Sequence, residues 1–293
     1  MQSRAPSSCI EYALRSIMGS SFPARAGVPV SLSPFDWFLA FILIVGLALW
    51  ARRERQRVQH GLSIGRTSVR MAGYRRLIFT QWSLVGMLGL HWALRARPAS
   101  DLGLTLGTGW RPAVGLLLAM AGTILLWLQL RSVQQSEENR ASAREALAGL
   151  QWLLPHSRRE LNSFMRVSLT AGICEELLYR GFLAWFLATW MPLWAALLVS
   201  GVLFGLAHLY QGVTGVLKTG LIGIVFGGIT LLTGSIIWAM ILHTAVDAIN
   251  GQLAYVALTT PAPHPDVTLD PPEPNPDVTF DHAKDSPTPD HPA

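Results

Sequence analysis

Long runs of apolar residues without a charged side chain most constrain the fold of this chain. Residues 113–130, 181–217 and 219–246 contain no Asp, Glu, Lys or Arg. A helix that crosses a bilayer needs about 20 predominantly apolar residues, so the stretch 181–246 is long enough for more than two crossings. Only 14% of the 293 residues are charged, against about 25% in ordinary soluble domains. The sequence therefore predicts an integral membrane protein.

The spacing of the apolar runs predicts an all-α fold, a polytopic membrane bundle of about seven to eight transmembrane helices. One of the later helices carries an acidic pair and ends near residue 190. The other expected helices cover residues 35–50, 77–94, 113–130, 193–210, 216–232 and 235–258. An arginine-rich loop is expected between the first two helices, at residues 51–76, and such a loop marks the cytoplasmic side. Residues 131–166 are expected to form one or two amphipathic helices.

Composition divides the chain into four parts. Residues 1–33 form an N-terminal arm, residues 34–160 hold the first membrane helices and the amphipathic segment, and residues 161–258 form a late membrane core. Residues 259–293 contain ten of the eighteen prolines and carry a net charge of −6. This tail and the arm are expected to be disordered, since neither has enough apolar residues to bury a core. The basic excess lies beside predicted helices, which favours a role in membrane topology and no nucleic-acid partner.

A cluster of charges lies inside the late apolar region. Glu175 and Glu176 are adjacent, and Arg180 follows four residues after Glu176, so Glu176 and Arg180 share one face of a helix and can pair. Glu175 points about 100° away and remains available to another element. A charge at the centre of a membrane helix costs roughly 2.5–3.5 kcal/mol on insertion scales. Since Glu176 can pair with Arg180, we expect Glu175 to be the reactive carboxylate and Glu176 with Arg180 to support it. The residues also allow the two glutamates to exchange these roles.

Two further polar sites occur on later helices. Phe204 and His208 are four residues apart, so the aromatic ring can pack behind the imidazole. His243, Asp247 and Asn250 follow at i, i+4 and i+7, which places them in one polar stripe. A lone membrane histidine is more often part of an interhelical hydrogen bond, and His91 in the second helix is interpreted that way. Three sites on separate late helices instead indicate one shared active site in a cavity among them.

Several chemistries fit these residue types. A glutamate and two histidines that converge on a water could deprotonate it and stabilise an oxyanion on a peptide carbonyl. The same groups with Asp247 are candidate zinc ligands, namely Glu175, His208, His243 and Asp247. A polar stripe could also line the ion or substrate pathway of a transporter, and the buried ion pair could serve only packing in a non-catalytic scaffold or immunity protein.

The three motifs, in this order and spacing, resemble the CPBP (Abi or CAAX prenyl protease-like) family of intramembrane metalloproteases. The motifs that carry the resemblance are Glu175-Glu176-x-x-x-Arg180, Phe204-x-x-x-His208 and His243-x-x-x-Asp247, within about residues 165–255. The resemblance implies a helical fold with a conical cavity that opens to the cytoplasm and the lipid.

The resemblance also implies roles for the catalytic residues. Glu175 and His208 hold and activate the water, while His243 and Asp247 stabilise the oxyanion and Glu176 with Arg180 supports the site. An ionised Asp has no proton to donate to an oxyanion. Asp247 is therefore either protonated, bound to metal, or an orienting partner of His243. Zinc stays an open alternative.

Partners and location follow from the same resemblance. It implies an endopeptidase that acts on a membrane-associated protein or peptide, with prenylated CAAX-type proteins as one substrate class, in contact with membrane lipid. Composition and the spread of the family indicate a bacterial inner-membrane protein with the active site toward the cytoplasm.

Overall fold

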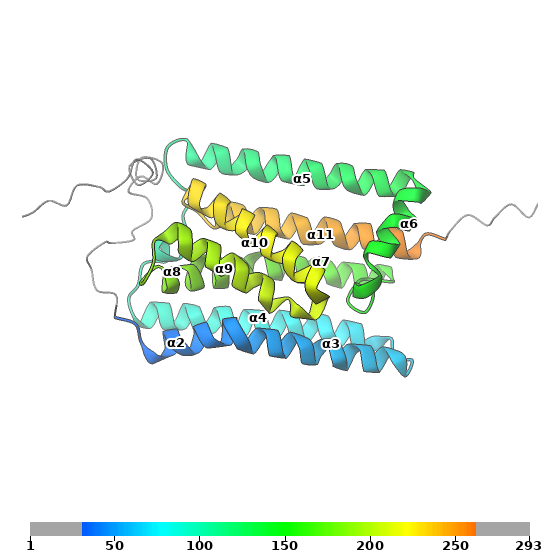
Figure 1. Cartoon of the computed structure of the whole chain (residues 1–293), viewed down its shortest axis with the longest axis horizontal. Helices are drawn as coiled ribbons and strands as arrows, with labels where there is room; N and C mark the ends of the chain where they lie inside the picture. The colour runs from blue at the N-terminus through cyan, green and yellow to red at the C-terminus, as the bar shows by residue number, and fades with distance from the viewer. Residues whose placement is uncertain (1–30, 262–293) are drawn as a thin grey trace, which may run out of the picture. The chain divides into compact units, whose positions relative to one another are not determined.

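Residues 31–261 are described by the computed structural model, and every regular element in this range is helical. The predicted arm and tail lie outside the described residues, except for residues 31–33 and 259–261. The helices, labelled in Figure 1, are α2 (Pro34–Phe41), α3 (Leu47–Ser63), α4 (Ser68–Leu94), α5 (Arg111–Gln135), α6 (Glu137–Ala146), α7 (Arg158–Glu176), α8 (Ala184–Leu187), α9 (Leu193–Ala207), α10 (Gly212–Thr233) and α11 (Ile237–Thr259). Two π-helical segments, Ile42–Gly46 and Leu177–Leu183, join α2 to α3 and α7 to α8 as continuous rods.

The late helices lie between two outer layers. Figure 1 shows α5 along one side and the α2–α3 rod with α4 along the other, while α7, α9, α10 and α11 lie between them. Within the bundle α7 packs against both α4 and α11, α11 also packs against α5, and α9 pairs with α10. This arrangement brings the acidic pair of α7 next to the polar stripe of α11.

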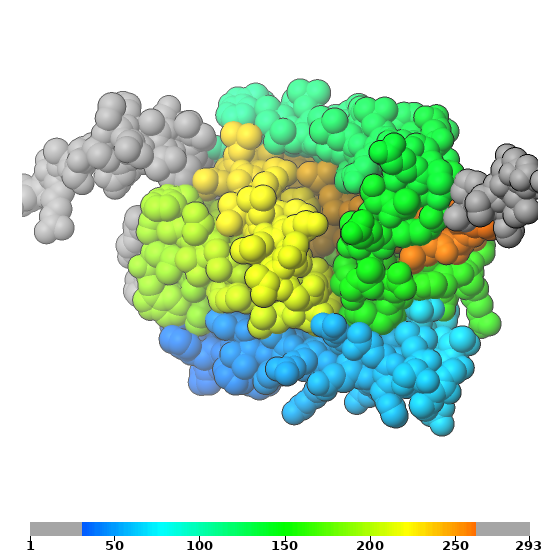
Figure 2. All heavy atoms as spheres, turned by 45° about the vertical axis from the view of Figure 1, so that its right-hand side comes forward, coloured from blue at the N-terminus to red at the C-terminus, as the bar shows by residue number. Residues whose placement is uncertain are grey.

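Within residues 31–261, four helical rods are long and apolar enough to cross a membrane. They cover Pro34–Ser63, Ser68–Leu94, Arg111–Gln135 and Leu209–Thr233. Figure 2 shows α10, in yellow, on the surface of the molecule, and its Val213, Leu217 and Leu221 are between 64% and 77% exposed. A row of large exposed apolar side chains suits a lipid environment. The predictions of an all-α fold and of a helical membrane bundle are confirmed, while the total of seven to eight crossings stays a prediction.

The predicted arginine-rich loop at residues 51–76 is wrong for most of its length. Helix α3 continues to Ser63 and α4 begins at Ser68, so only residues 64–67 connect them. Arginine is a good helix former, and hydropathy marks only the part of a helix inside the bilayer. Glu54 ties the two extensions together, because it accepts hydrogen bonds from Arg57 at 3.0 Å and from Arg76 at 2.9 Å.

The expected amphipathic region is also shorter than predicted. Helix α6 ends at Ala146 and a 3-10 turn follows at Ala148–Leu150, but α7 already begins at Arg158. Ser157 accepts a hydrogen bond from the backbone of Glu160 and thereby caps the N-terminus of α7. Residues 158–166 therefore belong to the helix that carries the acidic pair.

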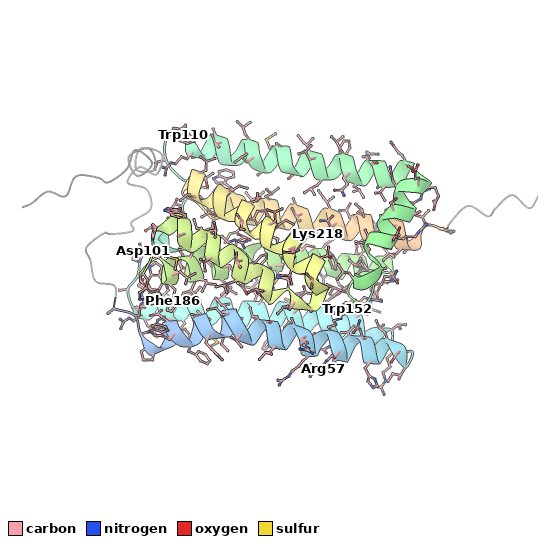
Figure 3. All side chains as sticks on the ribbon, viewed as in Figure 1. Arg57, Asp101, Trp110, Trp152, Phe186 and Lys218 are labelled. Atoms are coloured by element: carbon pink, nitrogen blue, oxygen red, sulfur yellow. The ribbon has the colours of Figure 1, made fainter. Side chains whose placement is uncertain are left out.

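His91 forms the interhelical contact that its position predicts. Its Nε2 lies 3.2 Å from Asp36 Oδ1 and 3.2 Å from Ser33 Oγ. Arg97 donates to both oxygens of the same carboxylate, at 2.7 and 2.8 Å. The group holds the N-terminus of α2 against the C-terminus of α4. Figure 3 shows Phe186 and Asp101 toward this end of the bundle and Arg57 and Trp152 toward the other.

Glycines allow the close crossing of α9 and α10. A Cβ at Gly223 would lie 2.9 Å from the carbonyl oxygen of Gly201, and one at Gly201 would lie 2.8 Å from the backbone nitrogen of Ile224. Gly228 is different, since a Cβ there meets no atom within 4 Å. The two backbones are therefore in contact along the face that holds Gly223.

A glycine also sets the approach of α7 to α11, and we expect Gly172→Ala to destabilise the protein. The added Cβ would lie 2.7 Å from the backbone nitrogen of Thr244, so one helix must shift. Overpacking of this kind costs about 1–3 kcal/mol. Thermal unfolding in detergent measures the effect, with Gly228→Ala as the control. Equal melting temperatures for the two variants would contradict the close approach.

Candidate active site

The acidic pair lies where α7 passes into a π-helical turn. Glu175 and Glu176 end α7, and Leu177–Leu183 follows with the wider winding. Single π turns inside α-helices occur frequently at functional sites. The carbonyl oxygen of Tyr179 accepts the backbone N–H of Ala184 within the turn, and Ser200 Oγ of α9 also donates to it at 2.7 Å. The sequence predicts one uninterrupted helix here and gives no sign of the π turn.

Glu176 and Arg180 form a fully buried ion pair. Arg180 Nη1 donates to Glu176 Oε1 at 2.7 Å, and neither side chain is exposed. Arg180 Nη2 also donates to the carbonyl oxygen of Gly223 on α10, at 3.0 Å. Its guanidinium carbon lies 4.4 Å from the ring centroid of Phe204 on α9. The pair predicted from the four-residue spacing therefore links three helices.

His243 of α11 faces all the carboxylates of the cluster. Its Nδ1 lies 2.8 Å from Glu176 Oε1, which leaves Nε2 on the other side of the ring. This Nε2 lies 3.9 Å from Glu175 Oε2 and 3.7 Å from Asp247 Oδ2. The orienting partner of the ring is thus Glu176, at the shorter distance, and Asp247 lies beside the nitrogen that remains for chemistry.

His208 caps the C-terminus of α9 instead of lying within that helix. Its Nδ1 is 2.8 Å from the carbonyl oxygen of Phe204, so in the neutral ring Nδ1 carries the proton and Nε2 is an acceptor. The ring centroid of Phe204 is 4.7 Å from that of His208 and 5.9 Å from that of His243. The aromatic packs behind the imidazole as predicted, and it also brings the two histidines to one place.

Exposure separates the members of the cluster. The side chain of Glu175 is 16% exposed and that of Asp247 is 34% exposed, whereas those of Glu176 and Arg180 are fully buried. A group that meets a substrate must be reachable, which fits Glu175 better than Glu176. Asn250 is exposed, and no hydrogen bond or ion pair within residues 31–261 joins it to the cluster.

Two residues near the cluster escape sequence reasoning. Gln81 of α4 donates from Nε2 to Glu175 Oε1 at 2.5 Å. Tyr210, in the 3-10 turn Leu209–Gln211, lies with its ring centroid 5.5 Å from that of His208. Gln81 is the one carboxamide in the apolar stretch 77–94, which also holds Thr80, Ser83 and His91, and an amide in a membrane helix could have drawn attention to it. Tyr210 follows the motif residue His208 by two positions, and this closeness could have drawn attention to it.

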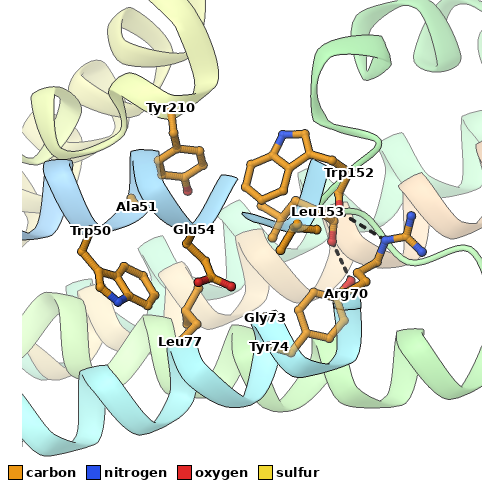
Figure 4. Close-up of a pocket in the computed structure, with 11 residues that line it drawn as sticks. Trp50, Ala51, Glu54, Arg70, Gly73, Tyr74, Leu77, Trp152, Leu153 and Tyr210 are labelled. Atoms are coloured by element: carbon orange, nitrogen blue, oxygen red, sulfur yellow. Dashed lines mark hydrogen bonds between the residues drawn. The ribbon is translucent and has the colours of Figure 1, made fainter. Parts of the chain in front are cut away.

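A small pocket of about 50 Å³ lies beside Tyr210 and apart from the cluster. Figure 4 shows Trp50, Tyr74, Trp152 and Tyr210 around it. The charged groups in its wall are already paired, since Glu54 accepts from Arg76 and Arg70 from α4 is 2.8 Å from Glu160. The wall is therefore apolar and offers no free charge, and the polar chemistry lies at the cluster.

The cluster also holds the candidate zinc ligands, and their donor types suit zinc. Within residues 31–261 no group of three His, Cys, Asp or Glu side chains already stands close enough together to hold a metal ion. Glu176 lies on Nδ1 of His243 and leaves Nε2 on the side of Glu175 and Asp247, and a carboxylate on the second nitrogen is usual for a metal-bound imidazole. Zinc at this cluster therefore stays a prediction.

Comparison with known proteins gives one result. Residues 158–249 match the family model described as type II CAAX prenyl endopeptidase Rce1-like. No curated protein and no solved structure matches the chain. The matched segment holds α7, α8, α9, α10 and most of α11, and with them all the residues of the three motifs, while Asn250 lies just beyond its end. Residues 158–249 are therefore similar to the CAAX protease-like (CPBP) family of membrane endopeptidases, the family that the three motifs resemble.

Proposed function

We propose that this protein is an intramembrane endopeptidase in which Glu175 and His208 activate a water molecule to hydrolyse a peptide bond. The observation that carries the proposal is the position of Glu175, which faces His243 Nε2 at 3.9 Å while Glu176 fixes the opposite edge of the same ring at 2.8 Å. A partly exposed carboxylate opposite an oriented imidazole is an arrangement that suits general-base hydrolysis.

The proposed reaction uses the carboxylate of Glu175 and the Nε2 atom of His208. Glu175 takes one proton from the water while the water oxygen bonds to the scissile carbonyl carbon, and His208 Nε2 accepts a hydrogen bond from the second water proton. The carbonyl oxygen gains the negative charge. When the carbon–nitrogen bond breaks, protonated Glu175 returns its proton to the leaving amine, and the atoms balance as the addition of one water.

The developing oxyanion needs a donor, and His243 Nε2 supplies it when the ring is doubly protonated. Three carboxylates lie around that ring, at 2.8, 3.7 and 3.9 Å, and compensate the charge of an imidazolium. Preorganised donors of this kind account for a large share of catalysis in acyl-transfer enzymes. Asp247 then acts as the acceptor that holds the His243 proton between substrates.

The substrate of this proposal is a membrane-associated protein or peptide, and prenylated CAAX-type peptides are the first class to test. The active site faces the cytoplasm of a bacterial inner membrane. Arg55, in the arginine-rich end of α3, donates to the carbonyl oxygen of Tyr210 at 2.6 Å. His208 is thereby close to the arginine-rich ends of the helices, which the positive-inside rule assigns to the cytoplasm.

We expect His208→Ala to lower kcat for cleavage of such peptides by about 10²-fold or more, because the water loses one of its two partners. Purified protein in detergent is incubated with fluorogenic membrane and prenylated peptides, with and without chelator. His156→Ala is the matched control, since His156 also bonds a backbone carbonyl but lies exposed and outside the cluster.

The outcomes of this assay distinguish a protease, a metalloprotease and a transporter. Loss of cleavage in the folded His208 variant alone supports the protease, and chelator sensitivity with rescue by zinc would make it a metalloprotease. Equal activity of wild type and His208→Ala would reject this active site. Absence of cleavage by the wild type, together with a response to an ion gradient in vesicles, would favour the transporter alternative.

A further inference from the structure

Gln81 reaches the candidate active site from outside the segment that matches the family. It lies in α4, about 80 residues before the start of α7, and is 8% exposed. Its Nε2 donates to Glu175 Oε1 at 2.5 Å. A carboxylate only accepts, so the amide must present its NH₂ group to Glu175 and its oxygen to the other side.

The remaining atom of this amide has no partner. Gln81 Oε1 is buried and forms no hydrogen bond within the described part of the chain. Buried polar atoms are nearly always satisfied, and exceptions call for an explanation such as a water or a functional role. A water or a peptide N–H beside Glu175 is a donor that would satisfy it.

We propose that Gln81 is a positioning residue that fixes the carboxylate of Glu175 and holds the attacking water or the substrate amide with its free oxygen. The inference rests on the proposed function of Glu175. One carboxylate oxygen, Oε1, is held by Gln81, so Oε2 is the oxygen that remains to take the proton. Helix α4 thus contributes to the reaction although the family match begins only at residue 158.

A second contact between the same two helices provides the control. Trp82 Nε1 donates to Thr170 Oγ1 on α7 at 3.3 Å, one residue from Gln81 along α4. Trp82→Phe removes that hydrogen bond without touching Glu175. Gln81→Met keeps the length of the side chain and removes both of its polar atoms, and Gln81→Glu keeps the shape but opposes a second carboxylate to Glu175.

Steady-state cleavage of the best peptide substrate in detergent tests the proposal. For Gln81→Met we expect kcat to fall by about 10²-fold with KM nearly unchanged, which is the effect of misplacing a catalytic group by about 1 Å. Gln81→Glu should lose as much or more, and Trp82→Phe should keep the kcat of the wild type. Thermal unfolding of every variant confirms that it is folded.

Three results would overturn the inference. If Gln81→Met keeps the wild-type kcat while Glu175→Gln is inactive, Gln81 has no positioning role although the proposed function stands. If Gln81→Met and Trp82→Phe lose kcat equally, both hydrogen bonds serve only the packing of α4 on α7. If Glu175→Gln cleaves as well as the wild type, the proposed function itself fails and the inference falls with it.

Discussion

Glu175→Gln is expected to lower kcat by about 10²–10⁴-fold while the protein stays as stable as the wild type. The amide cannot take a proton from water, and general acid–base catalysis typically contributes a factor of this size. Stability should be retained because Glu175 is 16% exposed and belongs to no short ion pair. Gln also keeps the acceptor oxygen that faces Gln81.

The measurement compares cleavage rates and melting temperatures of purified variants in the same detergent. Glu138→Gln is the matched control, since Glu138 is an exposed glutamate of α6 outside the cluster. A Glu175→Gln variant that is folded and still cleaves at a rate within a few-fold of the wild type would exclude Glu175 as the base. A variant that is inactive because it is unfolded would instead give Glu175 a structural role.

Arg180→Met is expected to have the largest effect on stability, a loss of about 3–5 kcal/mol. Removal of one partner from a buried ion pair leaves the other charge uncompensated, and losses of this size are measured in such cases. Here Glu176 would remain fully buried beside a side chain that donates no hydrogen bond, with His243 Nδ1 as its remaining partner. The carbonyl oxygen of Gly223 would lose its side-chain donor as well.

The control for this variant is an ion pair near the surface. Arg140 and Glu137 of α6 pair at 2.8 Å with partly exposed side chains, and exposed pairs contribute only about 0–1 kcal/mol. Denaturant unfolding in detergent should therefore distinguish Arg180→Met clearly from Arg140→Met. Similar stabilities for the two variants would show that Glu176 is neutral or solvated in the folded protein.

Sequence reasoning succeeds where the relevant interaction is local. Hydropathy finds the apolar cores of the membrane helices because a bilayer demands about 20 apolar residues. The spacing of Glu176 and Arg180 gives their ion pair, and the spacing of Phe204 and His208 gives their ring contact, because side chains four residues apart meet on a helix.

The same reasoning fails where partners come from different helices. Nothing along the chain indicates that Glu176 orients His243, since the two are 67 residues apart, or that Gln81 reaches Glu175 across 94 residues. Hydropathy also misplaces the ends of α3, because the arginines beyond the bilayer continue the helix. Asn250 follows the helical stripe of His243 and Asp247 but lies exposed.

The π turn at Leu177–Leu183 makes the orientation of α8 relative to the acidic pair depend on the number of residues in the turn as well as on their side chains. A π turn contains one residue more than α-helical winding needs, and each residue turns a helix by about 100°. Deleting a single residue there would rewind the segment and rotate α8 relative to the acidic pair without altering any charged group. An insertion or deletion within these seven residues is thus expected to rotate the Phe186 end of the helix relative to the Glu175 end.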